Sequence, residues 1–210
     1  MHHIWLVLWA PNFVPLVEYE KLAIVDFTVV GWTAENERGW KITDPRTIAK
    51  AKEELSQTLM AALENELQVE FDIVERRKLE AIQQEHRLAK DDSVQFGPSS
   101  DVWKLLKADR LLTGTVSFVM EVRQYKNKNL EMQTQTRTFH LSTSFKLIET
   151  GSGRLIAVGE EVVGTDSRRL RREGFSDETY LTPMCREMGT AIRERLNKAM
   201  KTRRDESKEN

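Results

Sequence analysis

One segment and the turn that follows it constrain the fold more than any other part of this sequence, because the side chains of the segment alternate. From Thr138 to Ile148 the chain reads TFHLSTSFKLI, in which apolar and polar residues take turns. A period of two is typical of a β-strand with one buried and one solvated face. The turn ETGSGR follows, with two glycines, and leads into the apolar run LIAVGEEVV. We therefore predict a β-hairpin whose buried face carries Phe139, Leu141, Phe145 and Leu147.

The buried face of that hairpin needs a helix to cover it, and the sequence offers two long candidates. Asp44-Pro45 begins a stripe of apolar residues at three- and four-residue intervals, which predicts a helix from Pro45 to Leu67. A second stripe begins near Thr182-Pro183 and runs to Leu196, before a polar tail at residues 201–210. Shorter helical patterns are predicted from Leu79 to His86 and in the segment DVWKLLKA at 101–108.

Three further segments are predicted strands. The run LAIVDFTVV, Leu22 to Val30, is typical of a central strand buried on both faces, and FDIV at 71–74 and LLTGTVSFVMEV at 111–122 are also strand-like. The order is strand, helix, strand, two helices, three consecutive strands and a helix. This order predicts one α/β domain over residues 21–200, with a mixed sheet of about five strands flanked by helices.

The first 20 residues form an apolar leader, in which the run from Ile4 to Val17 is interrupted by two prolines. The run is too short to span a bilayer, so we expect no transmembrane segment. It lacks the basic start and small-residue cleavage site of a secretory signal. Two interpretations stay open: a truncated or atypical signal, or a leader that packs on the domain.

Residues with catalytic or metal-binding chemistry are scarce. Cys185 is the only cysteine, which excludes an internal disulfide and a cysteine zinc site. The four histidines do not fall at ligand spacing, and Asp91-Asp92 is not followed by an EF-hand pattern. Gly151-Ser152-Gly153 joins two strands and opens no helix, so it is not a phosphate loop. We expect no catalytic residue, metal or cofactor. We expect Trp32 and Trp40 to pack over the edge of the core, with a partner surface as the alternative.

The strongest charge feature is the run of Arg168, Arg169, Arg171 and Arg172, between the last predicted strand and the last helix. Guanidinium groups bind carboxylates and phosphates with two hydrogen bonds. The run lacks the aromatic residues on which bases stack, and the formal net charge of −1 gives no general attraction to nucleic acid. The interpretations are a solvated loop, a contact for an acidic protein or an anionic lipid surface, or a nucleic-acid contact, which the missing aromatic residues disfavour.

Three motifs, in order, resemble the pattern of the CsgG-like family of bacterial envelope proteins. They are Val74-Glu75-Arg76 at a strand-to-helix junction, Lys107-Ala108-Asp109 before a strand, and Glu149-Thr150-Gly151 in a hairpin turn. Lys107 stands where the family pattern has glycine. The family includes the curli secretion channel and, more distantly, the penicillin-binding-protein activator LpoB. The resemblance covers roughly residues 21–200 and makes Glu75 a structural residue at a helix start rather than a catalytic one.

The resemblance implies a non-catalytic periplasmic module, associated with the outer membrane, that contacts cell-envelope proteins or other copies of itself. The segments that match the channel's membrane insertions, EVRQYKNKNLEMQTQTRTF and GTDSRRLRREGFSDET, are polar here. We therefore expect a role in assembly or secretion without a membrane pore of its own. One alternative is an LpoB-like activator of a peptidoglycan synthase. An alternative of another class is a hydrolase with active-site residues that lie far apart in the sequence.

Overall fold

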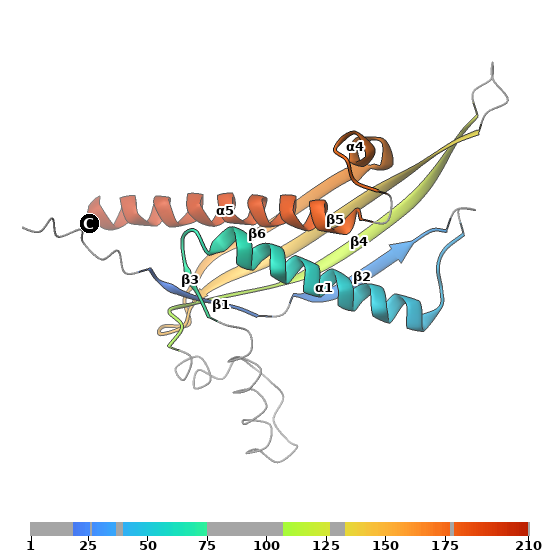
Figure 1. Ribbon diagram of the computed structural model, residues 1–210. Coiled ribbons are helices and arrows are strands. Elements are labelled where there is room, and N and C mark those ends of the chain that lie inside the picture. Colours follow the sequence, from blue (N-terminus) through green and yellow to red (C-terminus); the bar gives the residue numbers. More distant parts are fainter. Residues whose placement is uncertain are drawn as a thin grey trace, which may run out of the picture.

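The predicted hairpin lies within a mixed sheet that forms the body of the molecule (Figure 1). The computed structural model describes residues 19–25, 27–36, 40–74, 107–126, 133–176 and 179–209. Its strands are β1 (Lys21–Ile24), β2 (Thr28–Ala34), β3 (Asp72–Ile73), β4 (Arg110–Lys126), β5 (Gln133–Glu149) and β6 (Leu155–Asp166). Its helices are α1 (Pro45–Leu67), α4 (Ser167–Arg172) and α5 (Leu181–Glu209). The predicted α/β domain with a mixed sheet is confirmed, and the sheet has six strands.

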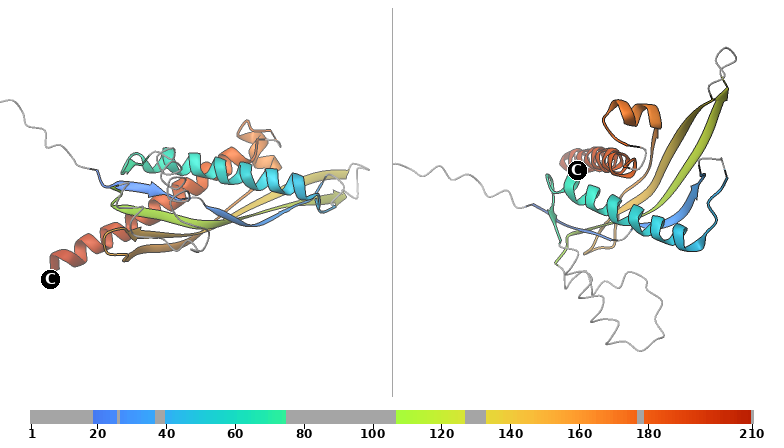
Figure 2. Two further views of the ribbon diagram at one scale, coloured as in Figure 1. Left: turned by 90° about the horizontal axis from the view of Figure 1, so that it is seen from below. Right: turned by 45° about the vertical axis from the view of Figure 1, so that its right-hand side comes forward.

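Strands β4, β5 and β6 are antiparallel and carry the alternation that the sequence predicts. Phe139, Leu141, Phe145 and Leu147 are each at most 1% exposed, whereas His140 on the opposite face is exposed. The turn between β5 and β6 contains Gly153 at φ 69°, a conformation that favours glycine. The register and the buried face of the hairpin are therefore as predicted. The far ends of β4 and β5 pair only with each other and extend beyond the helices (Figure 2).

The segment from Leu22 to Val30 is divided between two strands, so its prediction as one central strand is wrong in part. β1 is buried and lies between β3 and β4, all three in parallel. β2 pairs with β4 farther along that strand and forms an edge, where Val30 is 62% exposed. Between the two strands, the buried ring of Phe27 packs closely over Gly114 of β4. The apolar composition thus serves one interior strand, one edge strand and a core phenylalanine.

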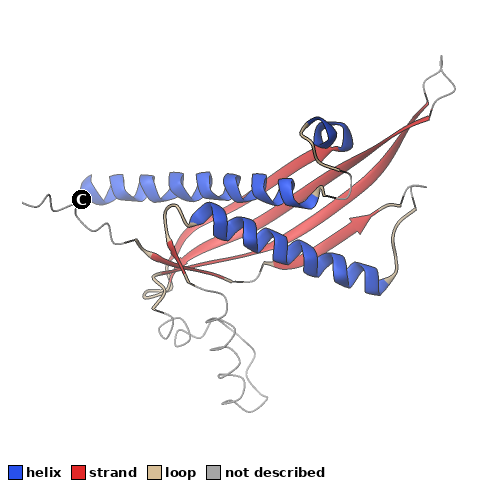
Figure 3. Cartoon of the chain, in the orientation of Figure 1, coloured by secondary structure: helices blue, strands red, loops and turns tan. Residues whose placement is uncertain are grey.

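Helices α1 and α5 pack against each other on the same face of the sheet (Figure 3). α1 has the predicted bounds, and the Asp44 carboxylate accepts a hydrogen bond from the backbone N–H of Thr47 at 2.8 Å. α5 begins at Leu181 and continues as helix through Glu209, including residues 201–209 of the predicted polar tail. The apolar stripes of both helices join the inward residues of β4, β5 and β6 in one core.

Two of the three family-like motifs meet at one end of the sheet. Asp109 Oδ2 accepts a hydrogen bond from Lys21 N at 2.8 Å, and Thr150 N donates to Asp109 O at 3.0 Å. Lys107 has φ 51°, so it keeps the left-handed conformation that glycine adopts readily at this position of the pattern. The motifs therefore tie β1, β4 and the β5–β6 turn together.

Several predictions fall outside the described residues. These are the leader, the helix from Leu79 to His86, most of the helix at 101–108, the Asp91-Asp92 pair, and the junction from Glu75 onward.

Candidate functional site

The arginine run forms the short helix α4, so the prediction of a loop is wrong. At its start, Asp166 Oδ1 accepts hydrogen bonds from the backbone N–H groups of Arg168 at 2.8 Å and Arg169 at 2.9 Å. At its end, Phe175 N donates to Leu170 O at 2.9 Å and Gly174 N donates to Arg171 O at 3.2 Å. Gly174 has φ 85°, and this pair of bonds is the Schellman arrangement that closes helices. A six-residue helix is therefore closed at both ends by local sequence.

Two side chains fix α4 to the sheet. Leu170 and Ser167 are each 1% exposed, and Leu170 belongs to the main core. The Ser167 hydroxyl accepts a hydrogen bond from Arg137 N of β5 at 3.2 Å. Because these residues point inward, Arg168, Arg169, Arg171 and Arg172 are all left exposed. The structure therefore brings the four predicted residues together on one small, anchored surface.

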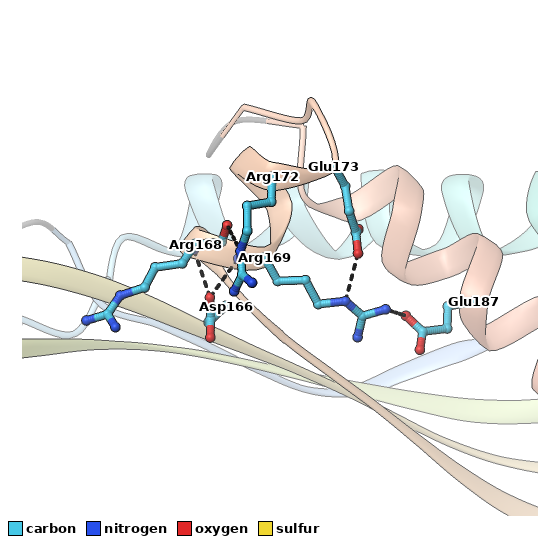
Figure 4. A network of polar contacts seen from close by, with 6 residues as sticks. All are labelled: Asp166, Arg168, Arg169, Arg172, Glu173 and Glu187. Carbon is cyan, nitrogen blue, oxygen red and sulfur yellow. Dashed lines mark hydrogen bonds and ion pairs between the residues drawn. The ribbon is translucent and has the colours of Figure 1, made fainter.

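Figure 4 shows how Arg168, Arg169 and Arg172 of this surface are arranged. Arg169 bridges two carboxylates, Glu173 at 2.8 Å and Glu187 of α5 at 3.5 Å. Arg171 Nε donates to Ser167 O at 3.1 Å, and Arg172 Nε donates to Arg168 O at 3.4 Å. The Arg168 side chain extends away from Arg169 and Glu187. Arg169 thus links α4 to α5 through Glu187, while Arg171 and Arg172 bond to backbone oxygens within α4.

The electrostatics of α4 follow from these contacts. The hydrogen bond that Arg169 donates to Glu173 raises the pKa of Arg169, and the charges of Glu187 and Glu173 act in the same direction. The hydrogen bond from the Arg169 backbone lowers the pKa of the Asp166 carboxyl, and the bond from Arg168 adds to it, while partial burial opposes both. Both groups therefore stay charged across the physiological pH range. Such exposed ion pairs contribute little to stability, so their role here is to orient side chains.

Replacing Asp166 by alanine is expected to lower the free energy of unfolding by about 0.5–2 kcal/mol, because α4 loses its capping acceptor. The folded-state pKa of Asp166 is lowered, so this stabilisation is complete above the unfolded pKa, about 3.9 for aspartate. It is lost as the pH falls through the folded-state value. Urea unfolding at pH 7 and at decreasing pH should show the difference from wild type shrinking in acid. The control is Asp205→Ala, at an exposed position of α5. An equal effect of the two changes would contradict the capping role of Asp166.

A small aromatic cleft lies on the same side of the sheet, between β2, α1 and the start of α5. Its cavity of about 120 Å³ is lined by Trp32, Ala51, Glu54, Leu55, Phe118, Tyr180 and Leu181. Tyr180 stacks on Phe118 and Phe139 with ring centroids 5.5 and 4.5 Å apart, and Trp32 lies 6.5 Å from Phe118. Burial raises the pKa of Tyr180, the negative charge of Glu54 raises it further, and the charge of Arg137 opposes them.

The prediction for the tryptophans is half right, because Trp32 packs on the core whereas Trp40 is 64% exposed. Sequence reasoning did not single out Glu54 or Tyr180. Glu54 looks like an ordinary polar position beside the apolar stripe of α1, and Tyr180 precedes α5. Only the fold places the two beside each other.

A wider depression lies at the other end of the sheet, around the β5–β6 turn. It has a volume of about 860 Å³ and is lined by Tyr19, Glu20, Lys21, Lys107, Asp109, Glu149, Thr150, Gly151 and Ser152. Its acidic groups are engaged within the fold, since Asp109 accepts from Lys21 N and Glu149 from the Ser152 hydroxyl. The glycine-containing segment is a hairpin turn, as predicted, and these bonds give it a structural role.

Reactive groups in the described part of the chain are few. Burial raises the pKa of the Cys185 thiol to about 12, which keeps it protonated at neutral pH. Among the described residues no group of three or more histidine, cysteine, aspartate or glutamate side chains is placed to hold a metal ion. Within the same ranges, no helix combines the length and apolar character needed to cross a bilayer.

Comparison with known proteins gives one match to a family. The model of the family described as curli production assembly/transport component CsgG matches residues 23–168. No curated protein sequence matches the chain.

The solved structures that are similar to the chain include the following three. Lipoprotein GNA1162 from Neisseria meningitidis is 10% identical, over 83% of this chain and 99% of its own, with a TM-score of 0.45. A putative neuraminyllactose-binding hemagglutinin homologue from Helicobacter pylori is 11% identical, over 91% and 90%, with a TM-score of 0.44. The LpoB C-terminal domain from Salmonella enterica is 16% identical, over 69% and 82%, with a TM-score of 0.35.

Proposed function

Because the chain belongs to the family of the curli production assembly/transport component CsgG, we propose that it is a non-catalytic module of the bacterial cell envelope. In this proposal it works on the periplasmic side of the outer membrane, in assembly or secretion. It acts by contacts with envelope proteins or with other copies of itself. It requires no cofactor, and nucleic acid is not among its partners.

The observation that carries the proposal is the anchored arginine surface of α4. A cationic surface on a flexible loop would lose conformational entropy on binding, whereas α4 is closed at both ends and fixed by Leu170. Its exposed guanidinium groups suit carboxylates, which they bind with two hydrogen bonds. The arrangement of α4 therefore suits binding to an acidic protein surface better than it suits catalysis. An anionic lipid surface is the other anion source that the experiment must distinguish.

We further propose that the chain forms no membrane pore of its own. The sequence from Arg123 to Thr136, RQYKNKNLEMQTQT, carries lysine, asparagine or glutamine at half of its positions. A lipid-facing strand needs apolar side chains at every second position. Planar bilayers exposed to the purified chain should stay silent, and stable stepwise currents would contradict this proposal.

Replacing Arg168, Arg169, Arg171 and Arg172 by glutamine should abolish envelope contacts and leave folding nearly intact. Glutamine keeps the helix propensity of α4, and exposed charges contribute less than about 1 kcal/mol each. We expect a melting temperature within a few degrees of wild type. In a pull-down from a bacterial envelope extract, proteins captured by wild type should be lost with the variant. The matched control replaces the same four residues by lysine, which keeps the charge without the bidentate geometry.

Each result bears on a different part of the proposal. A peptidoglycan synthase among the captured proteins would favour the LpoB-like alternative. Binding to vesicles with anionic lipid, but to no protein, would assign α4 to the membrane surface. Identical capture by wild type and the glutamine variant would refute a role for α4. Turnover of a substrate, blocked by a chelator or a serine reagent, would favour the hydrolase instead.

A further inference from the structure

β6 is an outermost strand that carries apolar side chains on its exposed face. In the described sheet it pairs with β5 alone. Val158 is 59% exposed and Val162 is 68% exposed, on the face opposite the helices, since the alternating residue Ala157 is buried. Leu155, at the start of the strand, is 46% exposed. An outermost strand with exposed apolar side chains is a template on which another strand can pair.

The leader that precedes β1 has the composition of such an added strand. Residues Ile4–Ala10 read IWLVLWA, an uninterrupted apolar run in which isoleucine, valine and two tryptophans favour a strand. Water around such a run is unfavourable, so burial of its side chains is favoured. Pro11 has no backbone N–H, and proline is therefore confined to strands at the edge of a sheet. The leader thus suits a position outside an existing strand.

The leader also joins the domain at the right place. Tyr19 lines the same depression as Gly151 and Ser152 of the β5–β6 turn, at the end of the sheet where β6 begins. Three strand spacings, about 14 Å, separate β1 from β6 across β4 and β5. About five extended residues span that distance, which leaves the segment before Val14 to run along β6. The outer edge of β3 is nearer, but β3 has only two residues.

We propose that residues Ile4–Ala10 of the leader add to β6 as a further strand and cover Val158 and Val162. The leader runs toward the end of the sheet where β6 begins, so the two strands are antiparallel. Pro11 then faces away from β6, and every second residue before it shares that outward direction. The inference goes beyond the proposed function, because it concerns the edge of β6 and not the arginine surface of α4.

The first test uses prolines in the full chain. Val7→Pro lies four residues before Pro11, so its missing N–H would face away from β6. Leu8→Pro, its matched neighbour, would remove an N–H that bonds to β6. Hydrogen exchange followed by mass spectrometry measures the protection of these N–H groups. We expect residues 4–10 of wild type to exchange at least about tenfold more slowly than in a synthetic peptide of residues 1–18. Val7→Pro should retain this protection and Leu8→Pro should lose it.

The second test changes β6 and leaves the leader intact. Val158→Lys/Val162→Lys puts two charges on the face that the leader would cover, and should abolish the protection of residues 4–10. Val30→Lys is the matched control, because Val30 is 62% exposed on the other edge strand, β2. This control should leave the protection unchanged. Circular dichroism should show that all the variants are folded, since each substitution lies in the leader or at an exposed position.

Four results would overturn the inference. The first is exchange of residues 4–10 in wild type as fast as in the peptide. The second is an equal effect of Val7→Pro and Leu8→Pro, or protection that survives the lysine pair, since the leader would then pack elsewhere. The third is protection that disappears on dilution, because a second copy would then supply the leader. The fourth is a lysine pair that changes exchange only in residues 75–106, which would make that segment the one that contacts β6.

Discussion

Replacing Phe145 by alanine is expected to lower the free energy of unfolding by about 3–5 kcal/mol, through lost burial and the cavity left behind. Phe145 is 1% exposed and lies on the inward face of β5. Its ring fits against Gly159 of β6, where an added Cβ would be 2.6 Å from Phe145 Cζ. No neighbouring side chain can fill the space from that direction. Urea unfolding monitored by circular dichroism gives the measurement.

The matched control is His140→Ala, on the same strand but on the exposed face. A surface substitution of this kind usually changes stability by no more than about 0.5 kcal/mol. Equal destabilisation by the two changes would mean that the register of β5 is shifted by one residue, because such a shift exchanges the buried and exposed faces of the strand.

Replacing Gly114 by alanine is expected to cost about 1–3 kcal/mol, because an added methyl group has no room in the centre of β4. Its Cβ would lie 2.4 Å from Phe27 Cε1 and 2.5 Å from the backbone oxygen of Ser144. The ring could turn, but the backbone oxygen belongs to the β4–β5 ladder and cannot move without disturbing it.

Gly151→Ala provides the comparison for this prediction, because a Cβ there meets no atom within 4 Å. We expect this variant to unfold at nearly the wild-type urea concentration. If Gly114→Ala were as stable as Gly151→Ala, Phe27 would not cross the sheet at Gly114, and the division between β1 and β2 would have to be revised.

The residues of the arginine site could be predicted from the sequence, but their helical structure could not. Four arginines close together are visible in the sequence, yet their charge also suggested a loop. The signals for a helix were present, with Asp166 as an acceptor before it and Gly174 after it. They are easily missed because an isolated helix of this length is not stable in water. It forms here because Leu170 adds to the core.

The cleft could not be predicted at all. Trp32, Glu54 and Tyr180 come from β2, from α1 and from the segment before α5. No local pattern links residues so far apart in the chain. Their proximity depends on how α1 and α5 pack over the sheet.

Periodic and capped segments are set by local physics, and here the sequence alone was sufficient. Pro45–Leu67 is a helix because Asp44 caps it and one stripe is apolar, and β5 and β6 form a hairpin because their side chains alternate around a glycine turn. The run from Leu22 to Val30 has no such period, since a buried strand and an edge strand can share an apolar composition. Whether this run forms one strand or two depends on where the Phe27 ring packs. It packs over Gly114, which lies more than 80 residues later in the chain. That contact, like the cleft, exists only once the sheet and its helices have packed.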